Sequence, residues 1–396
     1  MKRCGLLGER LGHSYSPAIH AMLGDFLKAR DFDGLNVTIP YKKAVLPYCA
    51  ELSPMAAAIG SVNTLLHRPD GSLYGDNTDA FGFESLLRHA GLGPAGRKCL
   101  VLGSGGASLA VRYVLNKLGA GEVVVISRSG EDNYDNLDKH KDASVIVNTT
   151  PVGMYPKTGA APVNLRDFPQ CEGVLDIIYN PARTALIQQA EALGIPCLGG
   201  LYMLVEQARC ASQVFTGKPL PAIRSKEVYS VMSRRKDNRI LIGMPGSGKS
   251  TVGRILAERL GRPFVDCDTE LEKRLGMTAG DYILKAGEED FRAQETAILA
   301  QLGKESGLVI ATGGGCVTRP ENYPLLHQNG TIIFLERELS KLPKKGRPLS
   351  LRGNLQDMYT IRLPMYRRFA DLIVPNDSSP ETVAKNVEEA YEHFSD

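Results

Sequence analysis

The chain lacks the features that mark several classes of protein. It has no unbroken apolar run of roughly 18 residues, so no membrane-spanning helix is expected. Its 8 cysteines are scattered, with no Cys-x-x-Cys pair and no Cys/His cluster at zinc spacing, which excludes a disulfide framework or a zinc site as the organising feature. The basic first residues are not followed by a long apolar region, so no signal peptide is expected. Free thiols in a cytoplasmic protein are the simplest interpretation.

Neither sign of charge is in excess. Lys and Arg number 47 against 44 Asp and Glu, and the net charge of +3 is too small to indicate a nucleic-acid partner. The composition, 43% hydrophobic and 23% charged, is that of an ordinary globular protein, and 396 residues suffice for two or three domains. Many of the 41 glycines follow apolar runs, as in α/β proteins whose backbone contacts ligands. We expect small-molecule partners and no membrane partner, and the sequence leaves the oligomeric state open.

One glycine-rich stretch carries a specific signal. Residues 243–251, Gly-Met-Pro-Gly-Ser-Gly-Lys-Ser-Thr, fit the phosphate-binding loop G-x-x-x-x-G-K-[ST]. An apolar strand (239–242) precedes the loop and helical spacing (252–260) follows it, so a helix N-terminus would face the phosphates. Lys249 would reach the β- and γ-phosphates of ATP, and the Ser250 hydroxyl would bind Mg²⁺. The residues expected to hold ATP are Gly246, Ser247, Gly248, Lys249, Ser250 and Thr251.

A second glycine turn lies nearer the middle of the chain. The predicted order is strand, glycine turn, helix and strand, at residues 98–102, 103–107, 109–118 and 122–126. This is a βαβ unit with a dinucleotide-type turn, although Ser108 replaces the third glycine. An NAD site would place an acidic residue after the second strand, but Ser127 and Arg128 stand there. Arg128 would accept a 2′-phosphate, which favours NADP; the nearby charge of Glu131 would oppose it.

Isolated polar residues in the first part of the chain follow short apolar runs. Ser14 and Ser16 precede a helix that starts near Pro17, so they are either helix caps or a carboxylate site. Lys42 follows a predicted strand (35–39), where a solvated surface lysine is the ordinary interpretation. Later segments, 60–64 and 75–79, also place amides and a carboxylate in loops after apolar runs, where open α/β sheets bind ligands.

The order of these elements predicts the domain organisation. We expect a substrate domain from residues 1–84 and 201–225, a nucleotide-binding domain at 85–200, a polar linker at 226–237 and a second nucleotide-binding domain at 238–396. The linker is predicted because residues 217–233 look loosely structured and 233–238 are polar.

Together, the motifs resemble two known families. The first ~225 residues resemble a shikimate dehydrogenase, and the chain from about residue 238 onward is similar to a shikimate kinase. The dehydrogenase motifs lie at 13–17, 36–42, 60–64, 76–79, 103–107, 148–154 and 203–208, and the kinase motifs at 243–251, 266–268, 287–292, 311–315, 346–349 and 362–366. The implied fold class is α/β, with a split substrate domain, a Rossmann-like NADP domain and a P-loop domain like that of nucleoside monophosphate kinases.

The dehydrogenase resemblance implies reduction of 3-dehydroshikimate to shikimate with NADPH. Lys42 and Asp79 would form the catalytic pair, since an ammonium held by a carboxylate can protonate the alkoxide left by hydride transfer. Ser14 and Ser16 would hold the substrate carboxylate, and Thr38, Asn63 and Gln207 would bind its hydroxyls. The implied NADP-binding residues are Gly103, Ser104, Gly105, Gly106, Ala107, Ser127, Arg128 and Gly200.

The kinase resemblance implies transfer of the ATP γ-phosphate to the 3-hydroxyl of shikimate. Asp266 would help to hold Mg²⁺ through water, and Asp268 would bind the substrate and take its proton. At i and i+2 after a strand, these two carboxylates are expected to share a face, although Asp-x-Asp is also a helix-start signal. The implied substrate-binding residues are Arg292, Arg362, Gly313, Gly314 and Gly315, and Arg347 would close over the phosphates.

Two segments depart from the family patterns. Only fifteen residues separate His20 from Asn36, too few for the usual strand and crossover, so the substrate sheet is expected to lack an element. Residues 338–361, which would form the lid that carries Arg347 over the phosphates, are also fewer than is usual in the kinase family. One alternative is therefore a kinase joined to a degenerate, non-catalytic dehydrogenase-like module, and another is a quinate dehydrogenase that uses NAD.

Overall fold

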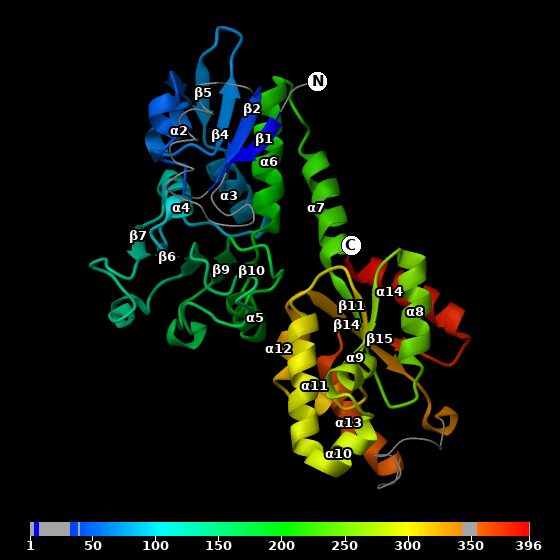
Figure 1. The fold of residues 1–396 in the computed structure, drawn as a ribbon. Helices are drawn as coiled ribbons and strands as arrows, with labels where there is room; N and C mark the ends of the chain where they lie inside the picture. Colours follow the sequence, from blue (N-terminus) through cyan, green and yellow to red (C-terminus); the bar gives the residue numbers. More distant parts are fainter. Residues whose placement is uncertain (1–3, 8–31, 39, 343–354, 396) are drawn as a thin grey trace. The chain divides into compact units, whose positions relative to one another are not determined.

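A computed structural model describes residues 4–7, 32–38, 40–342 and 355–395 of the chain. The chain divides into two compact units (Figure 1). The first unit contains Met1–Tyr179 and Thr184–Ser230, and the second contains Asn180–Arg183 and Val231–Asp396. The predicted α/β class is confirmed, since each unit is built from helices packed on five-stranded sheets. None of the helices in the described ranges has the length and apolar character needed to cross a membrane.

The first sheet is formed by the N-terminal part of the first unit. Its order is β1 (Cys4–Leu7), β2 (Gly34–Val37), β4 (Thr64–His67), β5 (Leu73–Asp76) and β3 (Glu51–Leu52). The pairs β1–β2 and β3–β5 are parallel, whereas β4 runs antiparallel to both β2 and β5. Alternate residues such as Leu35, Val37 and Leu65 face a buried core that also contains Tyr41. The segment in which an element is expected to be missing, between His20 and Asn36, lies outside the described residues up to residue 31.

Two helices close the substrate domain against the rest of the unit. They are α3 (Thr78–His89) and α6 (Leu201–Thr216), and the shorter α2 (Pro54–Ile59) lies beside the sheet. Gly82 allows α3 and α6 to approach closely, because a Cβ there would lie 2.7 Å from the Met203 carbonyl oxygen. The close approach of these helices brings residues near positions 80 and 205 into one site.

The second sheet forms the predicted nucleotide-binding domain and is entirely parallel. Its order is β10 (Cys197–Leu198), β9 (Gly173–Asp176), β8 (Val145–Asn148), β6 (Lys98–Leu102) and β7 (Glu122–Ile126). Both faces are covered, one by α3 and α4 (Gly106–Lys117) and the other by α5 (Ala185–Ala192). The predicted strands at 98–102 and 122–126 are confirmed, and α4 starts three residues earlier than expected, within the glycine turn itself.

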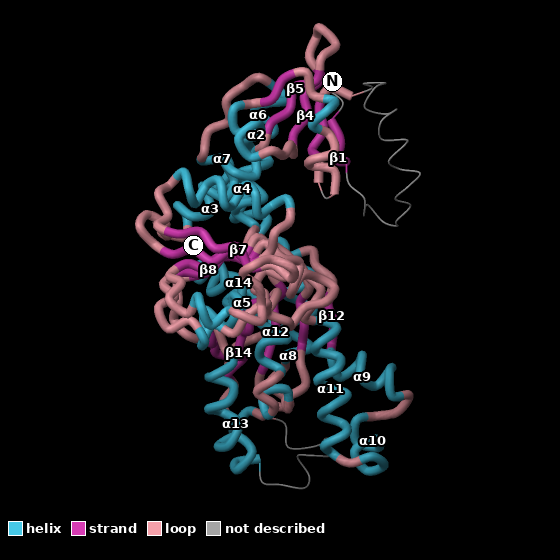
Figure 2. The backbone as a smooth tube through the Cα atoms, turned by 90° about the vertical axis from the view of Figure 1, so that its left-hand side faces the viewer, coloured by secondary structure: helices cyan, strands magenta, loops and turns pink. Residues whose placement is uncertain are grey.

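The third sheet organises the second unit and is also parallel. Its order is β12 (Phe264–Asp266), β13 (Val309–Ala311), β11 (Asn238–Ile242), β14 (Gly330–Glu336) and β15 (Leu372–Pro375). Successive residues of β11 enter opposite cores, Leu241 one and Ile242 the other, so both faces are covered. The helices are α8 (Lys249–Leu260), α9 (Cys267–Leu275), α10 (Ala279–Ala286), α11 (Glu288–Leu302), α12 (Asn322–His327), α13 (Leu355–Phe369) and α14 (Pro380–Ser395). Figure 2 shows α9, α10 and α11 side by side.

The prediction of a loosely structured polar linker at residues 226–237 is wrong. Residues 226–237 fall mostly within a helix, α7 (Ile223–Lys236). High polarity is typical of a loose linker, but this segment has no Gly or Pro after Pro221 and can form a helix. Its first half carries an i,i+3 ion pair, Arg224–Glu227 at 2.9 Å, and its last turn carries three basic residues that favour a helix C-terminus.

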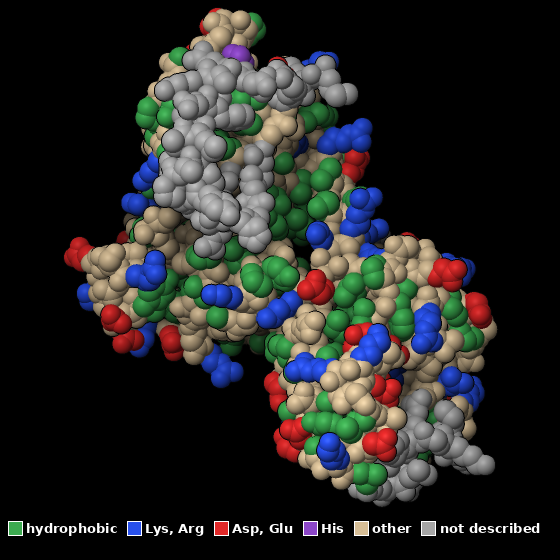
Figure 3. All heavy atoms as spheres, viewed as in Figure 1, with side chains coloured by type: hydrophobic (Ala, Val, Ile, Leu, Met, Phe, Trp, Pro, Cys, Tyr) green, Lys and Arg blue, Asp and Glu red, His purple; other side chains and the backbone are tan. Residues whose placement is uncertain are grey.

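Short 3₁₀ helices complete the described secondary structure. They are η1 (Leu46–Tyr48), η2 (Leu137–His140), η3 (Leu165–Asp167), η4 (Cys316–Thr318) and η5 (Leu339–Lys341). On the face drawn in Figure 3, basic and acidic side chains are interspersed, in keeping with the near balance of charge in the sequence.

Candidate active sites

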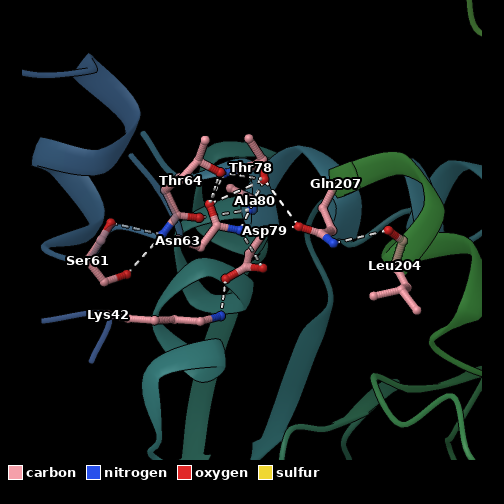
Figure 4. A network of polar contacts seen from close by, with 10 residues as sticks. Lys42, Ser61, Asn63, Thr64, Thr78, Asp79, Ala80, Leu204 and Gln207 are labelled. Carbon is pink, nitrogen blue, oxygen red and sulfur yellow. Dashed lines mark hydrogen bonds and ion pairs between the residues drawn. The ribbon is translucent and has the colours of Figure 1, made fainter. Parts of the chain in front are cut away.

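A lysine–aspartate pair lies at the centre of the first unit. Lys42 comes from the turn after β2, and Asp79 lies in the first turn of α3, whose N-terminus is capped by Asn77. The Lys42 Nζ atom lies 2.5 Å from Asp79 Oδ2, and both side chains are largely buried (Figure 4). Asn63 Nδ2 donates to the other oxygen, Asp79 Oδ1, at 2.9 Å. The carboxylate therefore fixes the ammonium in place, as a proton donor to a bound substrate must be fixed.

Three further side chains extend this pair into a network. Asn63 Nδ2 donates to Thr78 Oγ1 at 3.0 Å, and the Thr78 amide donates back to Asn63 Oδ1 at 2.8 Å. Gln207, from α6, accepts from Thr78 Oγ1 at 3.3 Å and donates to the Leu204 carbonyl (Figure 4). The structure thus brings Lys42, Asn63, Asp79 and Gln207 together. Thr78 was missed, although it stands inside a motif singled out for its neighbour Asp79.

Thr38, another predicted substrate residue, lies outside this network. Thr38 directly follows β2 and is half-buried, and its backbone amide donates to the Leu7 carbonyl at 2.8 Å. No side-chain contact between Thr38 and the network is observed among the described residues. Ser14 and Ser16 lie outside the described residues.

The glycine turn of the second sheet reaches the same pair. A Cβ on Gly106, the first residue of α4, would lie 3.8 Å from Lys42 Cδ. Gly103 has φ +104°, and a Cβ there would lie 2.9 Å from Thr150 Cγ2, so only glycine fits this turn. Ser104 and Gly105 are exposed, and Ala107 is half-buried. The turn therefore leaves the α4 N-terminus open to a ligand phosphate next to Lys42.

The residues that were predicted to bind the other end of the cofactor follow β7. Ser127 is half-buried, and Arg128 is exposed. In the described part of the chain Arg128 makes no ion pair, and neither does the exposed Glu131. Gly200 precedes α6, and its amide donates to the Ile178 carbonyl at 2.8 Å. A Cβ on Gly200 would lie 2.1 Å from the Ile177 carbonyl oxygen, so the close approach to the end of β9 requires glycine.

A buried carboxylate beneath the glycine turn was missed by the sequence analysis. Asp176, the last residue of β9, accepts from Asn148 Nδ2 at 3.1 Å to each oxygen, from Thr184 Oγ1 at 2.7 Å and from the Ile178 amide at 3.0 Å. Burial raises the pKa of Asp176 to about 6. Asn148 in turn accepts from the Thr150 amide at 2.9 Å, next to Gly103. An aspartate inside the apolar run 173–178 was the available signal.

The second unit contains the predicted phosphate-binding loop. Gly243, Gly246 and Gly248 have positive φ values of +152°, +83° and +91°, which explains the three glycines. α8 begins at Lys249, so its N-terminus faces the loop. The Lys249 ammonium is buried and donates to the carbonyl oxygens of Gly243 (2.9 Å) and Met244 (3.0 Å). The loop adjoins a cavity of about 730 Å³, and its lining includes Gly246, Gly248, Lys249, Ser250 and Thr251. Ser247, a residue of the loop itself, is fully buried and is not part of the cavity lining.

The same cavity is lined by the predicted substrate residues of the kinase. They are Asp268, Arg292, Gly313, Gly314, Gly315 and Arg362. Arg362 Nη1 donates to the Gly314 carbonyl at 3.2 Å. Arg292 is buried and ion-paired with Glu295 at 2.8 Å and Glu288 at 3.2 Å. A Cβ on Gly315 would lie 1.9 Å from Arg292 Nη1, so this glycine makes room for the guanidinium. The cavity thus joins a phosphate site to two arginines suited to a carboxylate.

The predicted relation between Asp266 and Asp268 is wrong. Strand β12 ends at Asp266, and Asp268 already lies in the first turn of α9, so the two carboxylates do not share a strand face. Asp266 caps the helix, since its Oδ1 accepts from the amides of Asp268 (3.0 Å) and Thr269 (3.3 Å). Asp268 lines the cavity and Asp266 does not. Arg347 lies outside the described residues.

Glu295 is a cavity residue that the sequence analysis missed. It is buried, and burial raises the pKa of its carboxyl group although Arg292 opposes this. A Cβ on Gly313 would lie 2.4 Å from Glu295 Oε1 and 2.8 Å from Asp268 Oδ1. Glu295 follows Arg292 by three residues on α11, and this helical spacing was the available signal.

The fold and these two sites define a protein with an oxidoreductase-type unit and a P-loop phosphotransferase unit. Residues 245–392 match the family model for shikimate kinase, and residues 22–65 match the model for the shikimate dehydrogenase substrate binding domain. The shikimate dehydrogenase (NADP(+)) of Clostridium perfringens (strain 13 / Type A) is 33% identical over an alignment of 271 positions, and the match spans 59% of this chain and 100% of that protein. The chain belongs to the shikimate dehydrogenase family, and it carries a shikimate kinase domain after the dehydrogenase part.

Solved structures agree with this membership. A chorismate mutase/shikimate 5-dehydrogenase fusion protein from Clostridium acetobutylicum is 34% identical with a TM-score of 0.53, covering 58% of this chain and 97% of that one. The shikimate 5-dehydrogenase of Thermus thermophilus, solved with NADP(H) and shikimate, is 34% identical with a TM-score of 0.50, covering 58% of this chain and 98% of that one. Both comparisons span nearly the whole length of those dehydrogenase chains.

Proposed function

We propose that the chain catalyses two consecutive reactions of the shikimate pathway: NADPH-dependent reduction of 3-dehydroshikimate to shikimate, then ATP-dependent phosphorylation of the shikimate 3-hydroxyl. The observation that carries the first reaction is the position of Lys42, bonded to Asp79 and adjacent to Gly106 of the cofactor turn. A proton donor and a hydride donor must meet at one carbonyl, and here their sites adjoin. The second reaction follows from the cavity that joins the phosphate loop to Arg292 and Arg362.

In the first unit, NADPH supplies the hydride when it is bound. The alkoxide that forms at the substrate carbonyl takes a proton from the Lys42 ammonium, while Asp79 orients and stabilises that ammonium. Asn63 and Gln207 have polar atoms around the pair and would bind substrate hydroxyls, together with Thr38. Ser14 and Ser16 would hold the carboxylate. Exposed Arg128 would bind the 2′-phosphate and so select NADPH over NADH.

In the second unit, Lys249 and the loop amides would bind the ATP phosphates. Arg292 and Arg362 would hold the shikimate carboxylate, and Asp268 would orient the 3-hydroxyl and accept its proton. Arg347 would close over the phosphates. The oxygen donors fit Mg²⁺: the Ser250 hydroxyl lines the cavity, and Asp266, which lies outside the cavity lining, keeps Oδ2 free of the cap bonds made by Oδ1 and would reach the ion through water. Magnesium, when bound, neutralises charge on the phosphates.

The eight free thiols suit a cytoplasmic location, which we also propose.

The test separates the two activities on the full chain. NADPH oxidation is followed after addition of 3-dehydroshikimate with ATP and Mg²⁺ withheld, and phosphorylation of shikimate is followed in a second assay. The variants Lys42→Ala and Lys249→Ala serve as reciprocal controls, each expected to lose one activity and keep the other. Loss of dehydrogenase rate on the order of 10²–10⁴-fold is expected for Lys42→Ala.

Each outcome has a definite meaning. An inactive first unit in a sample with full kinase activity would show that it is a non-catalytic module, contrary to the proposal. Unchanged NADPH oxidation in Lys42→Ala would refute the assigned proton donor. Phosphorylation of shikimate by Lys249→Ala at the parent rate would refute the kinase assignment. Faster turnover of quinate with NAD than of shikimate with NADP would replace the proposed substrate and cofactor.

A further inference from the structure

The phosphate loop of the second unit has two flanks, and the acceptor residues lie on one of them. The sheet order places β13 and β12 on one side of β11 and places β14 and β15 on the other. Gly313–Gly315 follow β13 and Asp268 follows β12, so the acceptor binds on that flank. The part of the nucleotide that is not transferred must therefore extend toward the ends of β14 and β15.

Two side chains from those strand ends lie against the loop. Arg337 directly follows β14, and Asn376 directly follows β15. A Cβ on Gly248 would lie 3.7 Å from Arg337 Nη1 and 3.7 Å from Asn376 Nδ2. Asn376 Nδ2 donates a hydrogen bond to the Ser247 carbonyl, so its role is to hold the loop.

Arg337 differs from Asn376 because its donors are not used. Its Nε atom is buried and has no hydrogen-bond partner, and no described carboxylate pairs with its guanidinium. The acidic groups around it have other partners: Glu336 pairs with Arg367 at 3.0 Å, while Asp377 and Glu338 pair with Lys341 at 3.2 and 3.6 Å. A buried guanidinium donor without an acceptor is costly, so a ligand that supplies one would bind favourably here.

We propose that Arg337 binds the phosphate chain of the donor nucleotide, on the flank of the loop away from the acceptor. The inference rests on the proposed kinase activity and adds a residue outside the loop motif. A cation beside Gly248 is placed to offset phosphate charge, and the planar guanidinium suits phosphate oxygens. A purely structural arginine would donate to loop carbonyls, as Asn376 does, but Arg337 donates to none of them.

The test compares Arg337→Ala and Arg337→Lys with Arg367→Ala in the full chain. Arg367, on α13, is the matched control because it is an exposed arginine that pairs with Glu336 at the end of β14. Binding of Mg·ADP and of inorganic tripolyphosphate is measured by calorimetry. Arg337→Ala should weaken both by about tenfold or more, since charge-assisted hydrogen bonds are lost. Arg337→Lys should lose less affinity than Arg337→Ala. Arg367→Ala should bind both ligands with the affinity of the parent protein. The KM for shikimate should be unchanged in all three.

Further measurements separate binding from folding. Because Arg337 makes no bond with a described residue, Arg337→Ala should melt at the parent temperature without ligand and should be stabilised less by ADP. Parent-like affinity of Arg337→Ala for both ligands would overturn the inference. A loss seen with ADP but not with tripolyphosphate would overturn the phosphate assignment, and so would an equal loss in Arg367→Ala. If the parent protein itself neither binds ADP nor phosphorylates shikimate, the kinase proposal fails first.

Discussion

Gly315 provides the sharpest test of how the kinase cavity is built. Replacing it with alanine adds one methyl group, and its backbone (φ −98°, ψ −5°) accepts alanine without strain. The new Cβ would lie 1.9 Å from Arg292 Nη1 and 2.2 Å from Cζ, so the guanidinium must move. It cannot move freely, because it is buried and bonded to Glu295 at 2.8 Å. Gly315→Ala should therefore displace an arginine that remains in the chain.

The magnitude follows from the contact that is lost. A charge-assisted hydrogen bond contributes about 1.5–3 kcal/mol, so misplacing Arg292 should raise the KM for shikimate by about 10- to 100-fold. The KM for ATP should change little, since the phosphate loop lies elsewhere in the cavity. Steady-state kinetics with each substrate varied in turn measures both values. Gly93→Ala, at a glycine with open space around its Cβ position, is the matched control.

A double mutant decides whether the effect passes through Arg292. In an Arg292→Ala background the added methyl group meets no guanidinium, so Gly315→Ala should have almost no further effect. An unchanged shikimate KM in the single variant would refute the predicted clash. If Gly315→Ala raises the shikimate KM by the same factor in the Arg292→Ala background as in the parent, Gly315 acts through something other than Arg292.

Three further predictions concern the first unit. Asp79→Asn removes the counter-charge of Lys42 and should lower the dehydrogenase rate by roughly 100-fold with kinase activity retained; a parent-like rate would count against the pair. Arg128→Ala should raise the KM for NADPH by about tenfold or more and leave that for NADH nearly unchanged, so equal effects would show that Arg128 does not contact the 2′-phosphate. Burial raises the pKa of Asp176 from 3.8 to about 6, so the folded protein holds a proton on this carboxyl group more tightly than the unfolded chain does. The stability that this proton contributes is fully present below pH 3.8 and is lost as the pH rises through 6. Hydrogen exchange of β8 and β9, corrected for intrinsic rates, should show about 1 kcal/mol less protection at pH 7.5 than at pH 5, and Asp176→Asn should abolish that difference; a difference that persists in the variant must come from another group.

The sequence predicted the α/β class and the glycine-rich turns because these depend on local patterns. Strands 98–102 and 122–126 are apolar runs after a charged first residue, and the positive φ values of Gly243, Gly246 and Gly248 explain why that motif needs glycine. The helix α7 was missed because polar composition is typical of a loose linker, whereas a polar segment without Gly or Pro also forms a helix when its residues favour one.

The unpredicted parts of the sites depend on contacts between distant segments. Nothing local to Gly106 indicates that it lies beside Lys42, and nothing local to Gly315 indicates a guanidinium against its Cα. The prediction for Asp266 was wrong because α9 begins directly after it, at Cys267, so the alternation of an extended chain does not continue and its carboxylate caps the helix. Glu295 and Asp176 were passed over because single carboxylates carry no motif, and only burial reveals their importance.

The bonds made by Lys249 bear on how the second unit handles its nucleotide. Because the ammonium already bonds two carbonyl oxygens of its own loop, an arriving triphosphate exchanges those bonds for new ones instead of adding to them. The net gain in affinity from this lysine is therefore modest, but the loop needs little ordering when the nucleotide enters. When the spent nucleotide departs, the same carbonyls take the ammonium back, so release need not leave an unpaired charge behind. An enzyme so arranged gives up tight retention of ADP and gains a loop that is ready for the next ATP.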